Sequence, residues 1–358
     1  MMAIFIDDIQ YIKKKFAKTE LFKDTSIIIT GAGGFLGFYF TSFFSELIKN
    51  GCGPKSLLLL DNYILGEPEH FKKMSTDQRI KCERFDIVKD DFNKIAEAKD
   101  ADYVIHMASI ASPVFYRKYP IETFNANIVG LTKLLEYYKE NKNLKGLLFF
   151  SSSEIYGDPD ENNIPTNEEY RGLVSCTGPR ACYDEGKRAG ETLCRMYNEV
   201  YGLPVRVARP FNNYGPGMSI YDKRVPADFA KAIIEDRDII IHSDGTPTRT
   251  FCYIADAIVG YLKVLTYDKY DYFNIGIEKP EITIIQLAGI YAEAGREIFD
   301  YNGEIKYEKP QEVNYLTHNP QRRCPDISKA RKYLKYEPEI LVDEGIRRYL
   351  QFLKEGSL

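Results

Sequence analysis

The sequence has few of the residues that build metal sites and disulfide frameworks. Its 358 residues include four scattered histidines and seven cysteines, and no two cysteines form a C-x-x-C pair. An odd number of cysteines argues against a disulfide framework, and separated histidines make no metal cluster. We therefore expect no bound metal ion and a reducing compartment, of which the cytoplasm is the simplest.

An excess of charge of one sign is also missing. The 48 lysines and arginines nearly balance 52 aspartates and glutamates, which leaves a net charge of -4. No basic block or arginine-rich arm suggests a nucleic-acid partner. Asp7 and Asp8 lie in the apolar start of the chain, unlike a signal peptide, and we expect no membrane partner. The length suits one core domain with a smaller lobe.

A glycine-rich turn is the first positive feature. The run TGAGGFLG begins at Thr30 and follows residues 26–29, whose β-branched side chains indicate a buried parallel strand. An apolar helical pattern comes after the turn. Three glycines allow a tight turn, a close approach to a pyrophosphate and close packing of the helix, whose N-terminus faces the phosphates. They are Gly31, Gly34 and Gly37.

A second hydrophobic strand supports a dinucleotide site. Residues 56–60 lead to Asp61, 24 residues after Gly37, where a carboxylate can bind both ribose hydroxyls of NAD. Asn62 and Tyr63 follow Asp61 in place of an arginine. The sequence therefore predicts NAD rather than NADP as the cofactor.

Two other interpretations compete with the nucleotide site. Residues 25–44 carry no charge, as a transmembrane segment would. Four glycines and the change from strand to helix periodicity argue against that interpretation. A glycine-rich turn without a ligand is the second alternative, and the surrounding strand, helix and Asp61 argue against it.

Strand and helix patterns alternate from residue 23 onward. They follow a short amphipathic helix in residues 1–22, which covers either a domain edge or a dimer surface. The alternation predicts an α/β protein with a doubly wound parallel sheet, the Rossmann fold. The candidate strands are 26–30, 56–61, 80–85, 102–107, 146–151 and 204–209.

The pattern also suggests how the chain is divided. Residues 23–210 are predicted to form the NAD-binding domain. Proline and glycine cluster at 210–217, so residues 211–358 are assigned mainly to a smaller C-terminal substrate-binding lobe. Within it, residues 251–276 are expected to return to the core and end in a further strand, and a helix is expected near 342–354.

Tyr183 and Lys187 form a candidate catalytic pair. They are four residues apart in the run GPRACYDEGKR, so on a helix they share one face. We expect the ammonium group to lower the pKa of the phenol, which could then remove a proton from a sugar hydroxyl near neutral pH. An ordinary helical tyrosine beside a surface lysine is the alternative. The glycine-rich turn and the serine-rich segment at 151–154 favour the catalytic interpretation.

With these motifs, the chain resembles the extended short-chain dehydrogenase/reductases, the NAD-dependent epimerase/dehydratase family, over roughly residues 23–355. Within them it most resembles the UDP-glucuronate decarboxylases. The matching runs are HMASIASP (106–113), SSSEIYGDP (151–159), GPRACYDEGKR (178–188), RVARPFN (206–212) and NPQRRCPD (319–326).

The resemblance implies a reaction and a set of site residues. Oxidation at C4 of a glucuronic acid gives a β-keto acid that loses CO2, and return of the hydride gives the pentose of UDP-xylose. The implied catalytic residues are Ser152, Glu154, Tyr183, Lys187 and Arg249. The implied substrate ligands are Tyr116, Ser152, Ser153, Glu154, Tyr183, Asn212 and Arg249. The implied cofactor ligands are Gly31, Gly34, Phe35, Leu36, Gly37, Asp61, Asn62, Asp86, Ile87, Ala108, Tyr183 and Lys187.

Each role beyond the tyrosine has a plainer alternative. Ser152 could be a helix cap, Glu154 a solvated carboxylate and Arg249 a phosphate ligand. By resemblance, Ser153 counts against a 4,6-dehydratase, which has an aspartate there, and Glu154 counts against a simple 4-epimerase. These two activities remain the nearest alternatives, and a non-catalytic nucleotide-binding protein is a third.

The chain departs from the decarboxylase pattern at three places. Ser152 replaces a threonine, Gly217 replaces an arginine, and His318 with Asn319 replaces a pair of aspartates. The serine keeps the hydroxyl group, so these departures bear on the nucleotide or the sugar more than on the reaction. The resemblance further implies a homodimer that pairs helices around 120–139 and 183–201.

Overall fold

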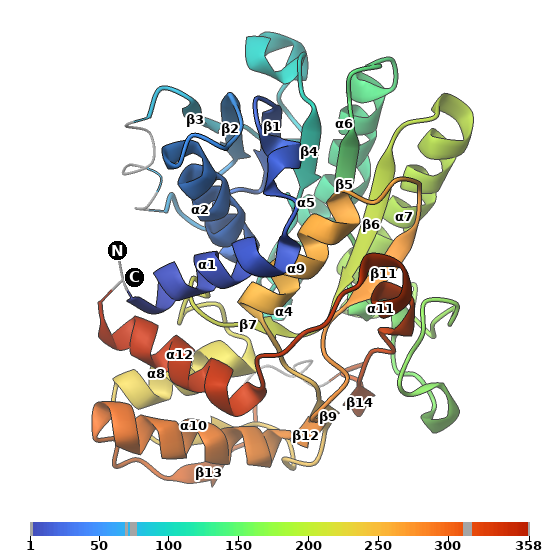
Figure 1. Ribbon diagram of the computed structural model, residues 1–358. Helices are drawn as coiled ribbons and strands as arrows, with labels where there is room; N and C mark the ends of the chain where they lie inside the picture. The colour runs from blue at the N-terminus through green and yellow to red at the C-terminus, as the bar shows by residue number, and fades with distance from the viewer. Residues whose placement is uncertain (1–2, 69–70, 72–76, 311–316, 357–358) are drawn as a thin grey trace.

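A seven-stranded parallel sheet forms the centre of the computed structural model, which describes residues 3–68, 71, 77–310 and 317–356. The strand order β11-β6-β5-β4-β1-β2-β3 confirms the predicted doubly wound fold (Figure 1). The strands agree with the predicted ones to within one residue at each end. They are β1 (Ser26–Thr30), β2 (Ser56–Asp61), β3 (Ile80–Arg84), β4 (Tyr103–His106), β5 (Gly146–Phe150), β6 (Val205–Pro210) and β11 (Tyr272–Ile275).

The sheet is buried on both faces because apolar side chains occupy both sides of its strands. On β1, Ile27 and Ile29 pack into one hydrophobic cluster, whereas Ile28 packs into the other. The first cluster lies under α2 (Phe35–Lys49) and α9 (Ile254–Leu265), and the second lies under α6 (Leu131–Tyr138) and α7 (Ala181–Tyr201). The uncharged segment 25–44 is thus divided between a strand and a helix. None of the described helices has the length and apolar character needed to cross a membrane.

The smaller lobe is built mainly from residues after β6, and the chain leaves it to rejoin the sheet. Residues of α9 and β11 make this return, with β11 pairing with β6. The lobe's helices are α8 (Val225–Ile234), α10 (Ile284–Phe299) and α12 (Val342–Lys354), whereas α11 (Ser328–Leu334) packs beside β11 and α9. The lobe's short strands are β7 (Asn213–Tyr214), β8 (Ile239–Ile241), β9 (Thr248–Arg249), β10 (Cys252–Tyr253), β12 (Ile282–Thr283), β13 (Ile305–Tyr307) and β14 (Arg322–Arg323).

The N-terminal helix α1 (Ala3–Phe16) joins the two parts of the molecule (Figure 1). Its Asp8 is fully buried and accepts hydrogen bonds of 2.7 Å from Tyr39 of α2 and from Tyr253 of β10. Arg348 of α12 donates to the same carboxylate at 3.0 Å. The helix therefore packs over the junction of the sheet domain and the lobe.

Candidate active site

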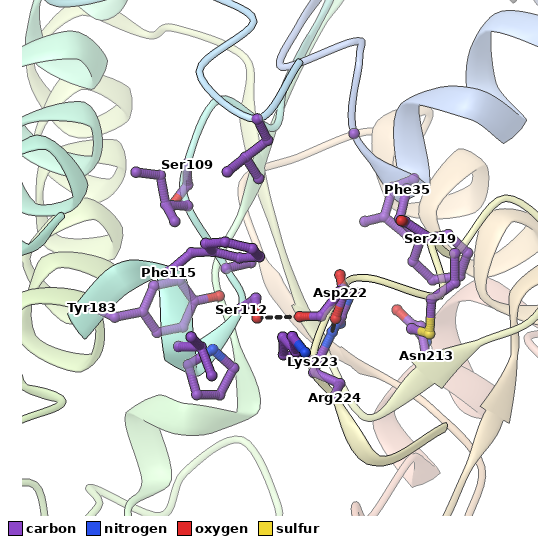
Figure 2. A pocket seen from close by; sticks show the side chains of 18 of the residues that line it. Phe35, Ser109, Ser112, Phe115, Tyr183, Asn213, Ser219, Asp222, Lys223 and Arg224 are labelled. Carbon is purple, nitrogen blue, oxygen red and sulfur yellow. Dashed lines mark hydrogen bonds and ion pairs between the residues drawn. The ribbon is translucent and has the colours of Figure 1, made fainter. Parts of the chain in front are cut away.

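A cavity of about 1330 Å³ opens at the carboxyl ends of the sheet strands. It lies where the strand order reverses between β1 and β4, the place where doubly wound sheets bind ligands. Residues of both the sheet domain and the lobe line it, and Figure 2 shows a part of this lining. The volume exceeds that of a typical pocket for one small ligand. All of the implied site residues line it except Tyr116.

The glycine-rich turn has the close packing expected of a cofactor cradle. A Cβ atom on Gly31 would come within 2.6 Å of the backbone nitrogen of Ala108, and one on Gly37 within 2.1 Å of the carbonyl oxygen of Ala32. Gly34, at the N-cap of α2, has no side chain to satisfy the first-turn N–H groups. These groups are available to an anion such as a pyrophosphate.

Asp61 lies beside this turn at the end of β2. Its carboxylate accepts hydrogen bonds from the backbone N–H groups of Gly33 at 2.9 Å and of Tyr63 at 2.8 Å. Burial raises the pKa of Asp61, which these two backbone donors partly offset. The side chain is thus fixed at the cavity wall, as binding of a ribose requires.

Two buried hydroxyl groups at the cavity support the presence of a polar ligand. The Oγ atoms of Ser109, after β4, and Ser151, after β5, have no hydrogen-bond partner among the described residues. A buried hydroxyl without a partner is costly, which favours a ligand that supplies the missing bonds. Together with the tight turn and Asp61, these residues fit a dinucleotide.

Tyr183 and Lys187 lie on one face of α7, as the spacing predicts, and both are buried. The Nζ atom of Lys187 is 5.6 Å from the centre of the Tyr183 ring and donates to the carbonyl oxygen of Phe150 at 2.8 Å. Burial lowers the pKa of this lysine to about 7.

The predicted effect of Lys187 on Tyr183 is wrong for this structure. Burial raises the pKa of Tyr183 to about 12, and a hydrogen bond with Ser152 is the largest opposing influence. The sequence showed the spacing of the pair but not how deeply both groups are buried, and burial outweighs the neighbouring charge. Ser152, which also accepts from the backbone N–H of Glu154 at 3.2 Å, therefore acts as both a cap and a partner of Tyr183.

Tyr116 does not reach the cavity. It is 1 % exposed, and its ring stacks on that of Tyr183 with centroids 5.1 Å apart and planes inclined by 10°. The guanidinium of Arg180 also lies over the Tyr116 ring, 5.8 Å from its centre. The structure thus places Tyr116 behind Tyr183, where it supports the ring of the candidate base.

Glu154 is held by two arginines that the sequence analysis did not single out. Arg180 and Arg323 both donate to its carboxylate, Arg323 through both terminal nitrogens. Burial would raise the pKa of Glu154, but the two guanidinium groups outweigh it and lower the pKa to about 2. Glu154 is therefore a fixed anion rather than a solvated loop carboxylate.

Arg180 and Arg323 come from runs already noted in the sequence. Arg180 precedes α7 within GPRACYDEGKR, and Arg323 lies on β14 within NPQRRCPD. The pairing of Arg323 with Glu154 spans 169 residues of the chain. No local signal in the sequence indicates which cation meets which carboxylate.

Arg249 lines the same cavity and differs from the other two arginines in its partners. It is 8 % exposed and donates to carbonyl oxygens of Thr248, Gln321 and Pro320 and to Oδ1 of Asn319. In the described part of the chain no carboxylate lies within ion-pair distance of it. Burial, followed by the charge of Arg323, lowers the pKa of Arg249 to about 9. Arg249 is thus a buried cation without a carboxylate partner among the described residues.

Asp222, Lys223 and Arg224 of the lobe lie across the cavity from Tyr183 (Figure 2). The hydroxyl of Ser112 donates to the carbonyl oxygen of Asp222 at 2.5 Å, which links the sheet domain to the lobe. Gly217 also lines the cavity, with a φ of +82°, and a Cβ there would lie 2.4 Å from the ring of Phe38. Of the residues that depart from the decarboxylase pattern, Gly217 and Asn319 line the cavity and His318 does not.

Comparison with known proteins gives a consistent result. Residues 27–276 match the model of the NAD dependent epimerase/dehydratase family. UDP-glucuronic acid decarboxylase 6 of Arabidopsis thaliana is 34% identical over 320 residues, which cover 89% of this chain and 86% of that protein. UDP-glucuronic acid decarboxylase 1 of Xenopus tropicalis is 33% identical and covers 92% of this chain and 72% of its own length.

Solved structures share the fold over nearly the whole chain. The UDP-glucuronic acid 4-epimerase of Bacillus cereus, in complex with UDP-glucuronic acid and NAD, has a TM-score of 0.75 and 26% identity. The match covers 92% of this chain and 99% of that one.

Proposed function

This chain belongs to the NAD dependent epimerase/dehydratase family, and from that premise we propose that it converts UDP-glucuronate to UDP-xylose with NAD as its cofactor. The relatives that are 31–34% identical over most of the chain are UDP-glucuronic acid decarboxylases. The observation that carries the proposal is the surplus of buried guanidinium groups at the cavity, which suits a substrate with a carboxylate.

The balance of charges around Glu154, the part of the cavity that we call the sugar side, supports a uronate as the substrate. Three buried guanidinium groups, those of Arg180, Arg249 and Arg323, line the cavity together with one fully ionised carboxylate, Glu154. Buried charges are stable when they are paired, so the cluster favours an additional anion. A uronate carboxylate supplies that charge, whereas an uncharged hexose does not. Arg249, which has no carboxylate partner in the described structure, is the proposed binding group.

The chain's own residues account for the proton movements of the reaction. When bound, NAD would supply the acceptor and later donor of the C4 hydride, and a positive charge beside the sugar. Tyr183 removes the proton from the C4 hydroxyl group, and Ser152 stabilises the phenolate by donating a hydrogen bond. The resulting β-keto acid loses CO2 readily because the ketone accepts the electron pair. The buried, fixed position of Glu154 suits a role in orienting the sugar rather than in exchanging protons.

The cavity residues suggest how the cofactor is held. We propose that the glycine-rich turn at Gly31 and Gly34, together with Phe35, Leu36 and Gly37 in the first turn of α2, binds the pyrophosphate. We assign Asp61 and Asn62 to the adenosine ribose. Asp86, Ile87 and Ala108 line the same side of the cavity and are assigned to the adenine and the backbone of the cofactor. Lys187 is assigned to the nicotinamide ribose. On the substrate side, Ser153 and Asn212 are assigned to the sugar and the diphosphate.

The product of the purified protein tests the proposal. Incubation with UDP-glucuronate, without added NAD, should give a product lighter by one CO2. An unchanged mass with inverted configuration at C4 would identify an epimerase instead, and the loss of one water would identify a dehydratase. UDP-glucose, which has no carboxylate, is the matched substrate control. Arg249→Met should abolish the reaction, whereas Arg195→Met, at an exposed arginine on α7, should not.

A homodimer is proposed on the face formed by α5 (Pro120–Asn125) and α7. Ile121 and Val200 are 69% and 70% exposed, and Phe124 and Met196 are also exposed. Contiguous exposed apolar groups favour association with another surface. Sedimentation of the wild type should give a dimer, and Val200→Lys should give monomers. All seven cysteines are free thiols, which suits the cytoplasmic location that we also propose.

A further inference from the structure

One buried carboxylate next to the arginine cluster has no role in the proposed reaction. Asp184 follows Tyr183 on α7 and is 6 % exposed. Its Oδ2 atom lies 3.5 Å from Nε of Arg180. Its Oδ1 atom is buried and has no hydrogen-bond partner among the described residues. A buried carboxylate with one long ion pair and an unpaired oxygen is poorly stabilised as an anion.

Arg180 is shared between this carboxylate and Glu154. Its Nη2 atom donates to Glu154, which receives two further hydrogen bonds from Arg323. Glu154 is thus paired with both arginines, whereas among the described residues Asp184 is paired only with Arg180. Two nearby buried carboxylates that compete for one guanidinium group do not ionise independently, and they titrate as a pair.

Of the two carboxyl groups, Asp184 is the one that binds a proton more readily. Burial, and then the charge of Glu154, raise the pKa of Asp184 to about 7, whereas Arg180 and Arg323 lower it. The pKa of Glu154 is held at about 2. Several other ionisable groups are electrostatically coupled to Asp184. They lie on α4 (Pro113–Lys118), in residues 153–156, on β14, on α7 and at the residue before α7. They are Tyr116, Glu154, Arg180, Cys182, Tyr183 and Arg323.

We propose that Asp184 is a positioning residue that takes up one proton from solvent when the carboxylate of a nucleotide-linked uronate binds beside the arginine cluster. This inference rests on the proposed function, because it requires a carboxylated substrate. The incoming anion adds a like charge and draws on the guanidinium groups that stabilise the Asp184 anion. Once protonated, Asp184 no longer competes for the guanidinium group of Arg180. Arg180 then pairs with Glu154 and the substrate, and the cluster keeps its geometry. No other bond forms or breaks in this step.

Calorimetric titration in two buffers measures the proton directly. Tyr183→Phe protein that retains its cofactor is titrated with UDP-glucuronate in phosphate and in Tris, whose ionisation enthalpies differ, because this variant binds without turnover. The dependence of the heat on the buffer should show net proton uptake at about pH 7.5, of at most one proton per uronate, because Asp184 is largely ionised there before the substrate binds. UDP-glucose should show no uptake. Adding Asp184→Asn to this protein should remove the uptake while UDP-glucuronate still binds.

The outcomes separate this inference from the proposed function. Binding of UDP-glucuronate without buffer dependence overturns the inference, and so does uptake that persists in Asp184→Asn. A failure of UDP-glucuronate to bind at all counts against the proposed function instead. If Asp184→Asn does not fold, Glu154→Gln offers a second test. It removes the competing anion and gives Arg180 to Asp184, so the uptake should fall, and unchanged uptake would again overturn the inference.

Discussion

The two sides of the cavity, to which we assign the cofactor and the sugar, are built in different ways. The cofactor side is a short contiguous turn in which backbone shape matters most, and Asp61 is its principal fixed charge. The sugar side has Glu154, Arg180, Arg249 and Arg323, which come from segments spread over about half of the chain. The cofactor side therefore depends on glycines that leave room for the backbone to pack closely. The sugar side depends on the balance between one carboxylate and three guanidinium groups.

This difference determines which amino-acid substitutions each side can tolerate. A cradle that needs glycines tolerates little substitution, but its function follows from local geometry. A cluster of buried charges is held by mutual pairing, so removing one member leaves another unpaired and costs more than the lost contact. Specificity for the sugar is thus coupled across the cluster, whereas recognition of the dinucleotide is not.

The largest effect should come from Tyr183, which lies between the two sides. Tyr183→Phe keeps the ring and its stacking on Tyr116, so the fold should be intact. Loss of a positioned general base should lower the rate of CO2 release by about 10²–10⁴-fold. Release of labelled CO2 and a thermal melt measure the two properties. Near-normal turnover would remove Tyr183 from the mechanism and leave the sugar side without its base.

Lys187 tests how strongly burial changes the pKa of a charged group that lies between the cofactor side and the sugar side. Its pKa is lowered from 10.5 to about 7, so the unfolded chain binds more protons between these values. The free energy of unfolding of the wild type, relative to Lys187→Met, should therefore rise as the pH rises through this window. This contribution is lost as the pH falls from about 10.5 to about 7, and below about 7 the difference should stay constant. The full change should be about 5 kcal/mol. Urea titrations at several pH values measure it, and a constant difference would contradict the prediction.

Asp61 tests the cofactor side through its charge. Asp61→Ala should weaken NAD binding about 10- to 100-fold, the loss of one hydrogen bond to a charged group. Asp61→Asn keeps one acceptor oxygen, so it can accept from Gly33 or from Tyr63 but not from both, and it should retain part of the affinity. Fluorescence titration of NAD measures both. Wild-type protein should release NAD and not NADP on denaturation, and bound NADP would refute the role of Asp61.

The smallest effect concerns backbone shape alone. Gly37→Ala places a Cβ 2.1 Å from the carbonyl oxygen of Ala32 and should destabilise the fold by about 1–3 kcal/mol. Gly289 is the matched control, because it lies within α10 and a Cβ there meets no atom within 4 Å. Gly289→Ala should stabilise the protein by up to about 1 kcal/mol. Equal melting temperatures for the two variants would show that the turn is not tightly packed.

The sequence was sufficient for the fold and for most of the cofactor side. Strand and helix periodicities are local, so all seven sheet strands could be predicted from runs of a few residues. The sugar side was predicted only in part. Pairing of Glu154 with Arg323, and the placement of Tyr116 behind Tyr183, depend on contacts between distant segments. The pKa of Tyr183 went in the unexpected direction because burial is a property of the folded molecule.

The position of α1 has a consequence for how ligands exchange. Its Asp8 bonds at once to α2, β10 and α12, so a hinge motion that swings the lobe away from the sheet would strip a buried carboxylate of its partners. A hinge motion of the whole lobe is therefore disfavoured. We expect nucleotides to exchange through a smaller movement of the lobe segment at Asp222, which the hydrogen bond from Ser112 ties to the sheet domain.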